Sequence, residues 1–214
     1  MIGAIEWSKI EAESPEAAWP LKDLDPGEPD WLSLSQGKND EWDFCDPSRP
    51  ESCFRNLLVK CSIEGGDANF TPYQLKDGGF HNLPGPLLDF LKLTDPLVWQ
   101  SSPYYRAANI ISQLIPIPYN QSNLLKFTTF LYLMAPEFRE LWIKKDPGAL
   151  LLISYWYAKT IPYQQWWTCK RADLECKAIC IFLERHHHDI PYLERLLEFP
   201  KRSCGLVSTQ KFAV

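Results

Sequence analysis

An apolar run of ten residues lies between Ala149 and Ala158, and within it only Ser154 is plainly polar. Asp146 suits the N-cap of a helix, and Pro147 suits the first helical position, where its missing N–H leaves no bond unmade. The run stops at Lys159, well short of the roughly 20 apolar residues that span a bilayer. We therefore predict a helix over 147–160 that is apolar on nearly all sides and forms the buried centre of the fold.

Further helices are predicted from residue 84 onward, where prolines repeatedly precede segments with helical spacing of apolar residues. In one of them Ala107, Ile110, Ile111 and Leu114 share a face. No alternating strand pattern of useful length competes, so the predicted fold class is all-α, a multi-helix orthogonal bundle over 84–205. The predicted helices cover 86–93, 103–115, 123–134, 136–144, 147–160, 168–186 and 191–198.

The first part of the chain, 1–83, has a different composition, rich in proline and acidic residues and carrying a glycine-rich loop at 62–82. We predict an irregular segment without a core of its own, held to the helical part by apolar anchors. The last residues, 206–214, are expected to form a flexible tail. The expected anchors are Trp19, Trp31, Leu32, Leu34 and Trp42.

Composition and charge favour some classes of protein over others. A chain of 214 residues with 45% hydrophobic residues and nine tryptophans can bury a real core in one domain. A net charge of −5 argues against a broad nucleic-acid-binding face, which needs clustered Lys and Arg. The N-terminus lacks a basic start followed by an apolar stretch, so no secretory signal is predicted. We expect residence in the nucleus or cytoplasm, no membrane span, and reduced cysteines.

The sequence contains few groups of residues suited to catalysis or metal binding. Three adjacent histidines, His186 to His188, point about 100° apart on a helix and are expected to form a solvated helix end. Cys176 and Cys180 approach the spacing of a zinc ligand pair, but on an apolar helix face they are expected to act as small buried hydrophobes. None of the familiar nucleophile, phosphate-loop or metalloprotease motifs occurs. The sequence therefore predicts no enzyme activity, no metal site and no cofactor.

Large aromatic side chains are concentrated between Tyr155 and Trp167. Aromatic residues with polar tips often line apolar pockets and orient a ligand through one or two hydrogen bonds. They also commonly fill the space between packed helices, and this is the more frequent role. Both interpretations stay open at this point.

Two stretches of the chain resemble a known family. PEFRELWIKKDPGALLLISYWYAKTIPYQQWWTCKRADLECKAICIFLER (136–185) is similar to the C-terminal end of the regulatory region in fungal zinc-cluster transcription factors, the group that includes the sterol uptake control proteins. A proline-acid-phenylalanine turn, a DP-A-LLL-YWYA helix, a tryptophan pair and a helix ending in LER recur there in this order. WPLKDLDPGEPDWLSLSQGKNDEW (19–42), with its W-L-x-L-x-x-G core, resembles the preceding segment. The resemblance extends over roughly 19–205.

The resemblance implies a helical regulatory domain that holds a sterol or another apolar metabolite in a pocket and has protein partners in transcription. The family's DNA-binding module, in which six cysteines hold two zinc ions, has no counterpart in this sequence, so DNA binding is not carried over. Two alternatives remain: a non-redox enzyme or accessory protein that uses the same apolar pocket, and a fragment without activity of its own. The ligand-binding residues implied by the resemblance are Leu151, Tyr155, Trp156, Lys159, Trp166 and Trp167.

Overall fold

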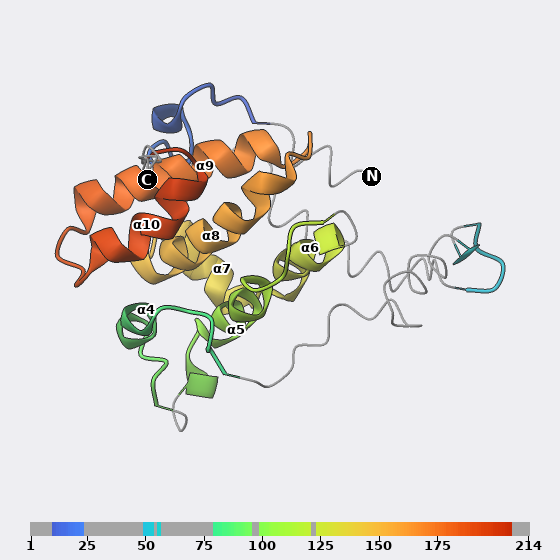
Figure 1. Ribbon diagram of the computed structural model, residues 1–214, viewed down its shortest axis with the longest axis horizontal. Helices are drawn as coiled ribbons and strands as arrows, with labels where there is room; N and C mark the ends of the chain where they lie inside the picture. The colour runs from blue at the N-terminus through green and yellow to red at the C-terminus, as the bar shows by residue number, and fades with distance from the viewer. Residues whose placement is uncertain are drawn as a thin grey trace, which may run out of the picture.

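The computed structural model describes residues 10–23, 49–53, 55–56, 79–95, 99–120 and 123–206, and within these the fold is all-α, as predicted (Figure 1). Helices pack around one hydrophobic core, and the described residues include no strand. Short 3-10 helices η1, η2 and η4 cover Pro15–Ala17, Trp99–Ser101 and Ile161–Tyr163. The α-helices are α4 (Gly85–Phe90), α5 (Tyr105–Leu114), α6 (Leu124–Leu133), α7 (Pro136–Ile143), α8 (Pro147–Thr160), α9 (Cys169–His186) and α10 (Leu193–Ser203).

Helix α8 is the centre of the fold, in agreement with its uninterrupted apolar sequence. Every residue from Gly148 to Thr160 is buried, and α5, α7, α9 and α10 all pack against the helix. Its first turn is fixed as the sequence predicts, because the Asp146 carboxylate accepts the Ala149 backbone N–H at 3.0 Å. The Tyr104 hydroxyl donates to the same Asp146 oxygen at 2.8 Å, and this bond ties the helix start to the residue before α5. No helix among the described residues is long and apolar enough to cross a bilayer.

Gly148 allows α8 to begin in close contact with two other segments. A Cβ atom at this position would lie 2.7 Å from a Leu91 methyl carbon and 3.0 Å from the Tyr104 ring. Such distances are shorter than carbon–carbon van der Waals contact. A larger residue here would force the Leu91 and Tyr104 side chains to move, so space rather than backbone conformation favours glycine at this position.

Helix α10 is longer than predicted. The predicted helix covered 191–198, whereas α10 covers Leu193–Ser203 and contains Pro200 in its interior. Proline has no N–H to give to the carbonyl of Leu196, four residues earlier, and that carbonyl is buried. The Tyr155 hydroxyl from α8 donates to this oxygen instead, at 2.9 Å. A side chain far away in sequence thus supplies the donor that the proline lacks, and the helix passes through Pro200.

The hydrogen bond from the Tyr155 hydroxyl to the Leu196 carbonyl should contribute measurably to stability. Replacing Tyr155 with phenylalanine should lower the free energy of unfolding by about 1–3 kcal/mol, because the buried Leu196 carbonyl loses its hydroxyl donor. Urea denaturation of the wild type, Tyr155→Phe, Pro200→Ala and the double variant measures the effect. In the Pro200→Ala background the restored backbone N–H should make Tyr155→Phe less costly. Equal costs in both backgrounds would contradict this role of Tyr155.

The N-terminal segment 10–23 lies across α9 (Figure 1). Trp19 is buried, and the centroid of its ring lies 4.4 Å from the centroid of the Trp142 ring on α7. At the start of the segment, Lys170 on α9 donates to the Glu13 carboxylate at 2.7 Å. The other anchors expected from the sequence, Trp31, Leu32, Leu34 and Trp42, lie outside the described residues, as do most of the 62–82 loop and the tail after 206.

Candidate functional site

Three of the residues predicted to bind a ligand lie on α8 in the interior of the protein. They are Leu151, Tyr155 and Trp156. The Trp156 ring stacks on Phe130 with 5.1 Å between ring centroids, and its indole N–H donates to the Phe127 carbonyl at 2.9 Å. Together these contacts fix α6 on α8. The polar tips of Trp156 and Tyr155 are therefore used by backbone carbonyls of the protein itself.

Lys159, the fourth nominated residue on α8, reaches the end of α5. Its ammonium group donates to the carbonyls of Ile115 and Ile117 at 2.8 and 3.1 Å, and it lies 4.5 Å from the centre of the Tyr119 ring. A cation at the C-terminal end of a helix also complements the partial negative charge there. Burial lowers the pKa of Lys159. Through these contacts, Lys159 stabilises the connection that follows α5.

The two adjacent tryptophans of the α8–α9 connection have different environments. Trp166 is 66% exposed, whereas Trp167 is half-buried against the core. The structure thus gathers four of the six nominated residues on α8, places Trp167 at the margin of the core and leaves Trp166 on the surface. Ligand binding by this set stays a prediction.

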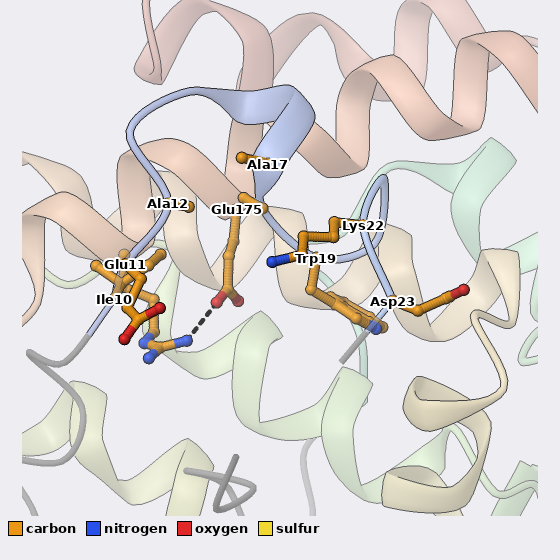
Figure 2. Close-up of a pocket in the computed structure, with 10 residues that line it drawn as sticks. Ile10, Glu11, Ala12, Ala17, Trp19, Lys22, Asp23 and Glu175 are labelled. Carbon is orange, nitrogen blue, oxygen red and sulfur yellow. Dashed lines mark hydrogen bonds and ion pairs between the residues drawn. The ribbon is translucent and has the colours of Figure 1, made fainter. Parts of the chain in front are cut away.

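A cavity of about 60 Å³ lies elsewhere, between segment 10–23 and α9 (Figure 2). Pockets for drug-sized ligands span about 300–1,000 Å³, so this cavity suits a few water molecules or a small ion. None of the nominated residues lines it. Its walls come from Ile10, Glu11, Ala12, Ala17, Ala18, Trp19, Lys22, Asp23, Arg171 and Glu175.

Beside this cavity, α8 and α9 share a buried polar group of three side chains. The Glu175 carboxylate receives a hydrogen bond from the Arg171 guanidinium and one from the Tyr157 hydroxyl, each at 2.5 Å (Figure 2 marks the ion pair). Burial raises the pKa of Glu175, while Arg171 and Tyr157 act in the opposite direction. This group was not predicted from the sequence. The available signal was an acid and a base four residues apart on α9, beside its apolar stripe.

Three cysteines from α9 and the end of α10 also meet in the interior. The sulfur atoms of Cys176, Cys180 and Cys204 all lie within 4.8 Å of one another, and all three residues are buried. Hydrogen bonds from Cys176 and Cys180 lower the pKa of the Cys204 thiol, and hydrogen bonding within the cluster together with burial raises the pKa of Cys176. Sequence spacing pointed to Cys176 and Cys180 alone. Cys204 joins them only because α10 packs on α9.

Helix α9 ends at His186, and His187 and His188 follow it directly. His186 and His188 are exposed, and the ring of His186 lies 4.7 Å from that of Phe182. Among the described residues the histidines do not belong to any group with the geometry of a metal site.

In comparisons with known proteins, the chain matches no protein-family profile, no curated protein and no solved structure.

Proposed function

We propose that this chain is a regulatory, effector-sensing domain of the fungal zinc-cluster transcription factor type, without a catalytic role. The observation that carries this proposal is the packing of the stretch with the strongest resemblance. Residues 136–185 cover α7, α8 and nearly all of α9, and α7 and α9 both pack against α8, the buried centre of the fold. The same proposal includes transcription proteins as partners and residence in the nucleus or cytoplasm.

The proposed effector is apolar, of the size and shape of a sterol. Since Tyr155 and Trp156 are already used in packing, we place the first contact at the α8–α9 connection, where Trp166 presents a large apolar ring to solvent. Trp167, at the edge of the core, would lie next to an effector bound there. Deeper insertion would require α6 to separate from Trp156, because the stacked Phe130 ring and the Phe127 carbonyl hold the indole in place. An effector bound in this way would change the packing of α6, and such a movement is a means of signalling.

Titration with a naturally fluorescent sterol tests the proposal, with energy transfer from tryptophan as the signal. The wild type should bind saturably at one sterol per chain, and Trp166→Ala should weaken binding about tenfold or more, which corresponds to at least ~1.4 kcal/mol. The fold should survive this change because the side chain is exposed. Tyr192→Ala is a matched control, since Tyr192 is 68% exposed on another part of the surface.

Native mass spectrometry of the chain purified from its own cells provides a second measurement. A bound molecule of lipid size would support the proposal and identify the effector. A folded chain that binds no sterol and carries no such molecule would overturn it. Equal weakening by Trp166→Ala and Tyr192→Ala would overturn the proposed contact point.

A further inference from the structure

The three cysteines of the interior form a preorganised set of sulfur ligands. Helix α10 packs on α9 (Figure 1). Cys176 and Cys180 are one turn apart on α9, so their side chains lie on one face of that helix. Cys204 directly follows α10, and its backbone N–H bonds to the carbonyl of Pro200. Two packed helices therefore fix the positions of all three sulfur atoms, which lie within 4.8 Å of one another.

The cluster is buried, and the polar groups in contact with it are weak ligands. Cys176 and Cys180 are fully buried and Cys204 is 4% exposed. The Cys176 sulfur lies 3.7 Å from the Ser154 carbonyl and 3.8 Å from that of Pro200, distances that suit weak S–H···O bonds. Such bonds hold the thiols in place and are easily given up to a metal ion.

We propose that Cys176, Cys180 and Cys204 bind one Cu(I) ion through their three sulfur atoms. Thiolates are soft ligands and select soft ions, among which Cu(I) is the common biological one. Zinc would need a fourth ligand to complete a tetrahedral site, and no His, Cys, Asp or Glu within the described residues joins the three. This proposal is independent of the effector proposed above.

The binding step balances without a redox partner. Three S–H bonds break, three Cu–S bonds form, three protons leave to solvent, and copper stays in the +1 state. The product carries two negative charges, and burial of charge requires nearby compensation. Part of it comes from Lys177 and Lys201, whose ammonium groups act to lower the pKa of Cys204 and Cys180, respectively, while each also pairs with a carboxylate, Asp173 or Glu184.

Anaerobic titration of the reduced full-length chain with Cu(I), in competition with a coloured Cu(I) chelator, tests the site. We expect one tightly held ion per chain. Cys204→Ala should weaken this binding by at least about 100-fold, since even the loss of groups that only orient a metal ligand costs 10- to 100-fold. Cys169→Ala is the matched control, because Cys169 is a half-buried free cysteine on the same helix but outside the cluster.

X-ray absorption at the copper edge gives a test on the wild type that does not depend on the folding of a variant. Three sulfur neighbours and no nitrogen or oxygen neighbour would support the proposal. Copper with nitrogen or oxygen neighbours, equal weakening by Cys169→Ala and Cys204→Ala, or a cluster that binds Zn²⁺ in preference to Cu(I) would overturn it.

Discussion

Replacing Trp156 with alanine is expected to lower the free energy of unfolding by about 3–5 kcal/mol, which is the usual cost of truncating a buried tryptophan. The side chain is 1% exposed, stacks on Phe130 and donates a hydrogen bond to the Phe127 carbonyl. The substitution therefore removes buried apolar area, leaves a cavity between α6 and α8, and deletes a bond between these helices. A typical total stability is about 5–15 kcal/mol, so the loss removes a large share of it.

Urea denaturation followed by circular dichroism measures this loss. Trp166→Ala is the control with the same chemical change at an exposed position, and it should alter stability by no more than about 0.5 kcal/mol. Trp156→Phe should fall between the two, because it keeps much of the stacked ring and loses the N–H donor. If Trp156→Ala and Trp166→Ala proved equally mild, Trp156 would not be a core residue.

The contrast between these two tryptophans also shows what sequence patterns could and could not predict. Helix α8 was predictable, because the Asp146 cap, Pro147 and an uninterrupted apolar run are local signals. The different environments of Trp166 and Trp167 were not, because neighbouring residues in a short connection have no periodicity that separates a buried face from an exposed one.

Two other differences arise from contacts between segments distant in sequence. Pro200 is a local signal for the end of a helix, and only the packing of α8 on α10 brings the Tyr155 hydroxyl to the carbonyl that the proline leaves without a donor. Similarly, Cys176 and Cys180 were visible as a pair at helical spacing, while Cys204 joins them only through the packing of α10 on α9. Local pattern thus predicts the helices, and side-chain groups assembled from several helices require the tertiary structure.

The second large effect is expected from Arg171, the cation of the buried group on α9. Arg171→Met should lower the free energy of unfolding at pH 7 by about 3–5 kcal/mol, because it leaves the buried Glu175 carboxylate without its cationic partner. The double variant Arg171→Met/Glu175→Gln should regain much of this loss, since neither charge remains to be desolvated. Urea denaturation of the two variants and the wild type at pH 7 tests this order. A double variant as unstable as the single one would contradict it.

The pH dependence of the same pair of variants identifies Glu175 as the cause. Burial raises its pKa above the ordinary value of 4.5, and the loss of Arg171 removes an influence that lowers it. The folded protein then holds a proton at pH values at which the unfolded chain has already released it, so stability falls as the pH rises through this window. We therefore expect the stability of Arg171→Met, measured relative to the double variant, to recover as the pH is lowered from neutral towards 4.5. A difference between the variants that does not change with pH would mean that the Glu175 charge is not what destabilises Arg171→Met.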